Sequence, residues 1–225
     1  IRGGDAYGKL IGHWWSEIGK MNQYVHMWGY KDPEEMRRLR SELAAKEDWK
    51  NKFVPLVGPN ILTQEVRLLR PLTQIKKPKN NTNIYELKII SLNIGQSVKW
   101  AKNFLDLVGS IENNSSNIGL WNTELQDPNE IISIWSHLNL ESMSKFWSDL
   151  ETNDDWRDFN NYQENSVKNE QNIILRPSIC SPMVSPIPIK RPVVKGMPSW
   201  PANSRVLNRT RGRLLGARAC GPPVA

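Results

Sequence analysis

Three side chains near the start of the chain carry groups that proteins often use for chemistry. His13, Glu17 and His26 lie in two neighbouring segments, and pairing these segments as a hairpin places all three on one face. Imidazole and carboxylate groups bind metal ions and form acid–base pairs. The simpler interpretation is that they are interior polar groups with hydrogen-bond partners, as buried polar groups usually are. We expect this structural role, with small-ligand binding as the first alternative and metal binding or catalysis as the second.

The same face carries aromatic rings, and a later carboxylate, Glu124, occupies the position equivalent to Glu17 in a repeat described below. The candidate pocket residues are therefore His13, Trp15, Glu17, Tyr24, His26, Trp28 and Glu124. The two glutamates could face each other as an acid–base pair, although a hydrogen bond to a sheet edge or an indole N–H is the simpler expectation. The sequence contains no glycine-rich phosphate loop, no G-x-S-x-G and no H-E-x-x-H pattern. We predict no catalytic residue, no metal and no cofactor.

The net charge of +7 would fit a nucleic-acid-binding protein, but it is unevenly distributed. Residues 181–225 contain eight Lys and Arg and no Asp or Glu, whereas residues 1–180 contain 22 basic and 23 acidic residues. The body of the protein is therefore close to neutral, and we expect no specific nucleic acid as its partner. No apolar run approaches the roughly 20 residues of a membrane span. Two cysteines are too few for a disulfide framework or a zinc finger.

The chain contains an internal duplication with an offset of 107 residues. The segment around Trp14 aligns with that around Trp121 without a gap, and two further tryptophans, Trp28 and Trp49, align with Trp135 and Trp156. Recurrence at fixed positions indicates that these rings pack in a core. Because the second copy begins near Ile84, we expect the first copy to begin before Ile1 and to be incomplete here.

Each copy has the pattern strand, helix, strand, strand, helix, strand, which predicts a ferredoxin-like α+β unit with an antiparallel sheet. In the second copy we expect strands over 84–92, 117–125, 130–138 and 172–175, and a helix over 97–108 that Ser97 caps. In the first copy we expect strands over 9–18, 23–30 and 64–69, and a helix with Asp32 as N-cap, Pro33 at its first position and a buried stripe of Met36, Leu39 and Leu43.

Pairing Ile18 with Gln23 would divide the first hairpin into two faces. One face holds Trp14 with Val25 and Met27, and the other holds the candidate pocket residues of the first copy. Antiparallel sheets usually expose one face to water, yet neither face here is plainly polar. We therefore expect the ring-rich face to pack against a second sheet, so that the two copies close a barrel of the dimeric α+β type.

The hairpin resembles that of the NipSnap family. The resemblance rests on the segment from Leu10 to Gly19, on Asn22, on Val25–Trp28 with Tyr30, and on Asp48-Trp49 in the following helix. It implies tandem domains of the dimeric α–β barrel superfamily and a mitochondrial protein without established catalytic residues. It also implies protein partners among autophagy or vesicle-trafficking factors, and is compatible with a homo-oligomer.

These inferences combine into one predicted organisation. Residues 1–72 form an incomplete first repeat, 73–83 an exposed polar linker, 84–180 a second repeat, and 181–225 a disordered, basic, proline-rich tail. The expected function is non-catalytic interaction in mitochondrial quality control or vesicle trafficking. The alternative is a small-ligand-binding protein or enzyme of the same barrel class that uses the face of His13, Glu17 and His26.

Overall fold

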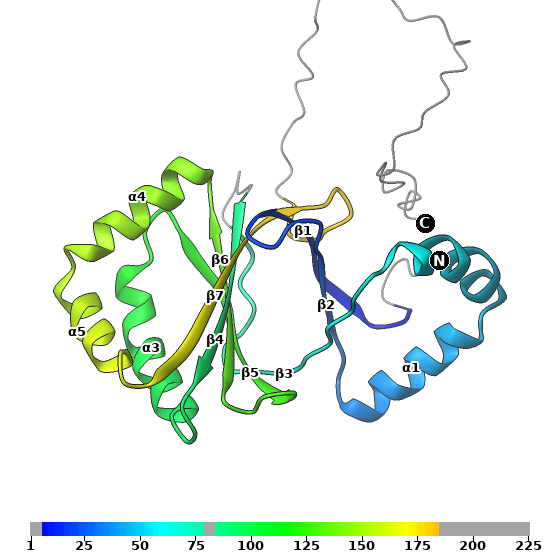
Figure 1. Cartoon of the computed structure of the whole chain (residues 1–225), viewed down its shortest axis with the longest axis horizontal. Helices are drawn as coiled ribbons and strands as arrows, with labels where there is room; N and C mark the ends of the chain where they lie inside the picture. The colour runs from blue at the N-terminus through cyan, green and yellow to red at the C-terminus, as the bar shows by residue number, and fades with distance from the viewer. Residues whose placement is uncertain (1–5, 79–83, 185–225) are drawn as a thin grey trace, which may run out of the picture.

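A computed structural model describes residues 6–78 and 84–184 of the 225-residue chain (Figure 1). Within these residues the strands form one curled antiparallel sheet in the order β2-β1-β7-β4-β6-β5-β3. The strands are β1 (Lys9–Ile18), β2 (Tyr24–Gly29), β3 (Leu68–Pro71), β4 (Ile84–Leu92), β5 (Ser116–Leu125), β6 (Glu130–His137) and β7 (Val167–Pro177). The helices are α1 (Pro33–Ala45), the π-helix η1 (Trp49–Phe53), α2 (Val54–Val57), the 3-10 helix η2 (Gly58–Asn60), α3 (Ser97–Ile111), α4 (Leu140–Glu151) and α5 (Asp154–Gln163).

The second repeat is a ferredoxin-like unit, as predicted. Its strands lie in the order β7-β4-β6-β5, and α3, α4 and α5 cover the outer side of the sheet (Figure 1). The helix α3 presents an apolar stripe to the sheet, with Trp100, Phe104 and Val108 all buried. The predicted cap at Ser97 is wrong, because Gln96 precedes the first turn and makes no side-chain capping bond.

Strands of the first repeat extend this sheet at both ends. At one end β1 pairs with β7, with Trp14 opposite Pro177, and at the other end β3 pairs with β5, with Leu69 opposite Thr123. Under the offset of 107 residues, β1 is equivalent to β5, and β3 is equivalent to the end of β7. The two junctions are therefore equivalent under an internal twofold relation, which is the arrangement expected of two repeats in a dimeric α–β barrel-type fold.

The first hairpin is formed by the predicted segments in a different register. His13 lies opposite His26 and Trp15 opposite Tyr24, and the Ser16 N–H donates to the Gln23 carbonyl at 3.0 Å. The predicted pairing of Ile18 with Gln23 is therefore wrong by two residues. Side chains alternate with a period of two along a strand, so a slip of two leaves the same residues together on each face.

The helical part of the first repeat begins as predicted. The Asp32 side chain accepts a hydrogen bond from the Glu35 N–H at 2.8 Å, and Pro33 takes the first helical position. The equivalent Asn139 caps α4 in the same way. Of the expected stripe only Leu43 is buried, while Met36 and Leu39 stay half-buried. The last strand, β3, begins four residues later than the predicted 64–69.

Two apolar clusters lie on the two sides of the curled sheet. The outer cluster joins α3, α4 and α5 to residues such as Leu120, Ile131 and Trp135. The inner cluster is enclosed by the strands of both repeats and contains Trp14 and its equivalent Trp121. The prediction that the ring-rich face of the first hairpin would line the interior is therefore wrong.

The glycine two residues before each interior tryptophan explains this choice of face. A Cβ on Gly12 would lie 1.8 Å from the Trp14 ring, and one on Gly119 would lie 2.5 Å from the Trp121 ring. Each indole folds back over the bare backbone of its glycine, so only the side with the glycine can hold the large ring against the interior. The neighbouring His13 and Trp15 then point outward.

The segment after β3 stays close to the sheet instead of leaving it at once. The Lys76 N–H donates to the Ile118 carbonyl at 2.8 Å, and the Lys76 ammonium forms an ion pair with Glu112 at 2.8 Å. The predicted disordered tail lies outside the described residues, apart from 181–184. Across residues 6–78 and 84–184, no helix combines the length and apolar character that crossing a bilayer requires.

Candidate functional site

The candidate residues of the first hairpin form a ring cluster on the outer face of β1 and β2. The His13 and Tyr24 rings meet edge to face at 4.2 Å between centroids, and the Trp15 and Tyr24 rings lie 5.3 Å apart. The His26 ring is 6.4 Å from that of His13 and accepts a hydrogen bond from the Trp28 indole N–H at 2.9 Å. The structure thus brings together five of the predicted residues, on a face that is half exposed.

The turn that sets this geometry depends on left-handed backbone at Gly19 (φ 106°) and Asn22 (φ 59°). Glycine adopts this conformation without steric cost, and asparagine tolerates it better than most residues. The Gln23 N–H also donates to the Ser16 hydroxyl at 3.0 Å across the turn. Because these contacts hold both strand ends, they fix His13 opposite His26.

His13 is also held by the segment that follows β7. Its Nδ1 hydrogen-bonds with the Ser178 hydroxyl at 2.5 Å and lies 3.3 Å from the Tyr24 hydroxyl. Its backbone N–H donates to the Ser181 hydroxyl at 3.0 Å, and its carbonyl accepts from the Ser178 N–H at 2.9 Å. Three hydrogen bonds of His13, two with Ser178 and one with Ser181, thus fasten β1 to the end of the second repeat. Nothing in the sequence pointed to the two serines, because they lie 165 and 168 residues from His13.

Burial lowers the pKa of His13 to about 4, and the nearby His26 contributes to the same shift. The imidazole is therefore uncharged at neutral pH. An imidazole with so low a pKa is a weak base and accepts a proton poorly at pH 7. A hydrogen-bonding role therefore fits His13 better than general-base catalysis.

The two equivalent glutamates do not face each other. Glu17 forms an ion pair with Arg176 at 2.8 Å, and Glu124 forms one with Arg70 at 2.8 Å. Each pair spans one of the two junctions between the repeats, so the acid–base alternative for Glu17 and Glu124 is wrong. The two arginines, Arg176 and Arg70, occupy corresponding positions near the ends of β7 and β3.

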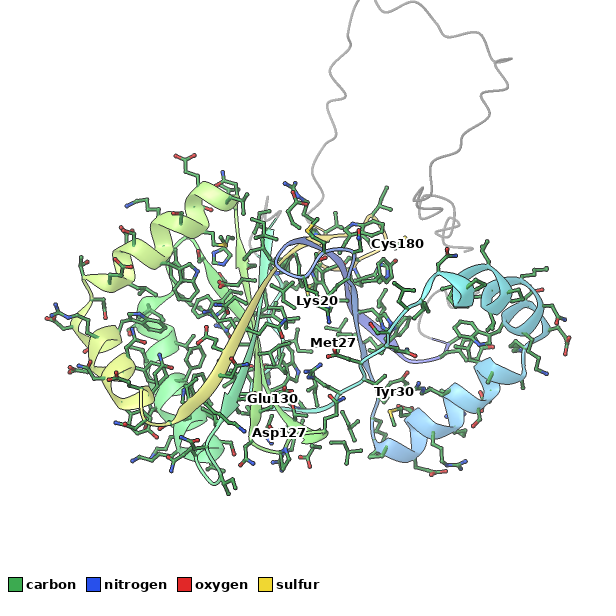
Figure 2. The ribbon with its side chains drawn as sticks, in the orientation of Figure 1. Lys20, Met27, Tyr30, Asp127, Glu130 and Cys180 are labelled. Carbon is green, nitrogen blue, oxygen red and sulfur yellow. The ribbon has the colours of Figure 1, made fainter. Side chains whose placement is uncertain are left out.

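An ion pair that the sequence analysis missed joins a buried carboxylate inside the curled sheet to a half-buried guanidinium. The Arg67 guanidinium donates to both carboxylate oxygens of Glu130, at 2.7 and 3.3 Å, and the Thr123 hydroxyl donates to one of them at 2.9 Å. Figure 2 shows Glu130 on the β6 side and Met27 on the β2 side of the interior. The sequence did carry a signal for this site. Glu130, Ile132 and Ile134 are spaced by two along β6, which places the carboxylate on the inner face with the two isoleucines.

A second buried polar group lies under α4. His137 is fully buried, its Nδ1 is 2.7 Å from the Ser115 hydroxyl, and its Nε2 is 3.6 Å from the Glu86 carboxylate. The Trp147 indole donates to the same carboxylate at 2.9 Å. These residue types resemble those of a hydrolytic triad, but the hydroxyl is fully buried, so no substrate carbonyl can reach it. The group holds α4 on the sheet.

A surface pocket of about 550 Å³ lies beside α3, away from the ring cluster. Its apolar wall comes from residues such as Val98 and Leu105, and its polar rim includes Lys102 and the ion pair of Arg70 with Glu124. Glu124 is thus the only predicted site residue that lines it. In the part of the chain that the structure describes, no group of three or more His, Cys, Asp or Glu side chains is placed to hold a metal ion.

Comparison with known proteins places the chain among its relatives. The family model NIPSNAP matches residues 2–75 and again residues 85–182, in agreement with the duplication. The chain belongs to the NIPSNAP family.

Relatives in this family include human NipSnap homolog 3A, which is 25% identical in an alignment 188 residues long that covers 79% of this chain and 74% of the relative. Mouse NipSnap homolog 3B is 26% identical over 187 residues. A solved structure from Lactobacillus acidophilus, described as a candidate monooxygenase, superposes with a TM-score of 0.54 at 16% identity and covers 76% of this chain and 78% of its own. This likeness shows a shared fold.

Proposed function

We propose that this NIPSNAP-family chain is a non-catalytic interaction protein of mitochondria, acting in quality control or vesicle trafficking. Its partners would be proteins of the autophagy or trafficking machinery. Family membership supports the general role, and the arrangement of the candidate residues supports its non-catalytic character.

The observation that carries the proposal is how the interior of the barrel-type sheet is filled. Trp14 and Trp121 are buried within it, together with aliphatic side chains from both repeats such as Leu87 and Ile134. Small barrels whose interior is filled by side chains act as packed cores rather than binding chambers. The candidate His and Glu side chains lie on the opposite face, where Glu17 is neutralised by Arg176.

A second candidate function is small-ligand binding or catalysis by the outer ring cluster. The observation in its favour is the contact of His13 with Tyr24, a hydrogen-bonding pair on a half-exposed surface. The Lactobacillus acidophilus protein of similar fold is described as a candidate monooxygenase. This function requires a ligand that contacts His26 or Glu17.

One comparison separates the two functions. The full chain is screened by thermal shift against metabolites, flavins and haem, beside the variants His26→Ala and Glu17→Ala. The interaction role predicts that no compound raises the Tm of the wild type, and that the tagged full chain co-fractionates with mitochondria in cells. A compound that raises the wild-type Tm and loses its effect in both variants would establish the second function instead.

A further inference from the structure

The loop between β4 and α3 holds apolar side chains outward at one end of the second repeat. Ile94, in the loop, is 91% exposed, and Val98, in the first turn of α3, is 81% exposed. Leu125, at the end of β5, is 64% exposed. Figure 1 shows that the β4–α3 and β5–β6 loops lie at the same end of this repeat. Single apolar residues are normal on a protein surface, but a group of them at one end indicates an interaction site.

Hydrogen bonds hold the β4–α3 loop in one conformation. The Gly95 N–H donates to the Asn129 Oδ1 at 3.2 Å, and the Asn93 N–H donates to the Ser166 carbonyl at 2.8 Å. Gly95 has left-handed backbone, with φ of 79°, which glycine adopts without steric cost. The N–H groups on either side of Ile94 are thus paired within the protein, so Ile94 can leave water without leaving them unsatisfied.

Lysines border these apolar residues on α3. Lys99 and Lys102 are exposed in its first two turns, and the chain contains no Asp or Glu from Leu87 to Leu105. The two neighbouring loops carry one carboxylate each, Asp127 and Glu164. The positive charge at this end is therefore concentrated on α3, next to its exposed valine.

The apolar surface continues from the loop along α3. Val98, Ala101 and Leu105 line the surface pocket of about 550 Å³, and Lys102 lies at its rim. A lysine can extend its apolar stem over such a surface while its ammonium group stays in the polar layer above. An apolar strip bordered by lysines is the pattern of elements that rest on a membrane surface.

We propose that this end of the second repeat binds the surface of a phospholipid bilayer. Ile94 and Val98 enter the acyl layer beneath the headgroups, and the ammonium groups of Lys99 and Lys102 pair with lipid phosphates. This inference goes beyond the proposed function, because the ligand is a lipid surface and no residue of the ring cluster takes part in binding it.

A bilayer fits this end better than a folded protein does. Ile94, Val98 and Leu125 come from a loop, a helix and a strand end, and all three are exposed at the same end. A deformable apolar layer can receive all three side chains, whereas a rigid protein needs a matching hollow for each anchor residue. A protein partner at this end is therefore treated as an outcome of the experiment.

Binding to vesicles tests the proposal. The full chain is mixed with large vesicles made of equal parts of phosphatidylcholine and phosphatidylserine, and the bound fraction is measured by sedimentation as the lipid concentration rises. We expect saturable binding that Ile94→Asp weakens at least about tenfold, because a carboxylate would have to leave water where the isoleucine enters the acyl layer. The matched control Leu62→Asp adds the same charge at a residue of the first repeat that is 96% exposed, and should bind as the wild type does. Both positions are exposed, so both variants should keep the wild-type Tm.

A second pair of variants tests the lysines. Lys99→Ala combined with Lys102→Ala should weaken binding to the same vesicles about fivefold or more, and added salt should reduce this difference, because ions screen charges at a membrane surface. Lys46→Ala combined with Lys50→Ala removes the same charge from the first repeat and should have little effect. Equal losses in the two double variants would overturn the assignment of the lysines.

Three results would overturn the proposal as a whole. The first is that the wild type does not bind the vesicles. The second is that Ile94→Asp binds them as the wild type does, which would attribute binding to other basic residues, such as those of 185–225. The third is that Ile94→Asp loses co-fractionation with mitochondria while its vesicle binding is unchanged, which would assign this end to a protein partner. None of these results changes the thermal-shift comparison, so the proposed function is tested separately.

Discussion

At the scale of single residues, the two repeats use the same backbone turn with different side chains. Gly19 and its equivalent Gln126 both have left-handed backbone, with φ of 106° and 99°. The residue types differ, so the duplication alone does not indicate that the two positions share a backbone conformation. A glutamine in this region is strained, and glycine is not.

We therefore expect Gln126→Gly to raise the free energy of unfolding by about 1 kcal/mol, through relief of that strain. The reverse change, Gly19→Gln, should lower it by a similar amount. Urea unfolding of both variants measures the difference. A destabilised Gln126→Gly would show that the side chain makes a contact worth more than the strain.

The glycine beneath each interior tryptophan allows a sharper test. Gly119→Ala places a methyl group against the Trp121 ring, so we expect a loss of about 1–3 kcal/mol of stability. Gly109 in α3 is the matched control, because nothing lies within 4 Å of a Cβ there. Gly109→Ala should stabilise the protein by up to about 1 kcal/mol, since alanine is the better helix former. Equal effects of the two changes in chemical denaturation would show that the ring does not rest on Gly119.

At the scale of elements, His13 joins β1 to the segment after β7, and this junction should respond to pH. The pKa of His13 is about 4 in the folded protein, against 6.5 for the unperturbed group. His13 therefore becomes protonated below about pH 6.5 in the unfolded chain, but only below about pH 4 in the folded protein. Stability is complete above pH 6.5 and falls as the pH drops towards 4.

After allowance for the partial exposure of His13, we expect its share of this loss to be about 1 kcal/mol. His13→Gln should flatten the stability profile between pH 6.5 and 4 in urea titrations. His26→Gln removes the imidazole whose electrostatic effect contributes to the lowered pKa of His13, so it should raise the His13 pKa measured by NMR. An unchanged profile in His13→Gln would mean that other groups carry the acid sensitivity.

At the scale of the whole molecule, two kinds of ion pair connect the repeats. Glu130 is 6% exposed and is bound by Arg67, whereas the pair of Arg70 with Glu124 lies at the surface. Arg67 is half-buried while Glu130 is buried, so Arg67→Met leaves a buried carboxylate without its partner and should cost about 3 kcal/mol, the lower end of the range for buried pairs. Arg70→Met should cost at most about 1 kcal/mol. Thermal and urea unfolding at low and high salt compare the two, and a similar cost for both would show that Glu130 is reached by water.

Much of the local structure was predictable from the sequence. The strands β1 and β4 have the predicted bounds, because alternating and β-branched residues are enough to indicate a strand. Asp32 and Pro33 similarly marked the start of α1. The hairpin register was not predictable, since the hydrogen bond of Ser16 with Gln23 and the backbone of Gly19 decide it, and these act only once the turn forms.

The sequence by itself determined that a ferredoxin-like α+β unit was duplicated and where most of its elements lie. Only the tertiary structure decided which face of the first hairpin is interior and which strands meet across the repeats. Both faces carry rings, so composition could not choose between them, and the choice depended on Trp14 folding over Gly12 inside the curled sheet. Every strand edge offers the same backbone N–H and C=O groups, so the sequence of a strand does not reveal which strand it will pair with. The pairing of β1 with β7 depended instead on contacts between distant residues such as His13 and Ser178.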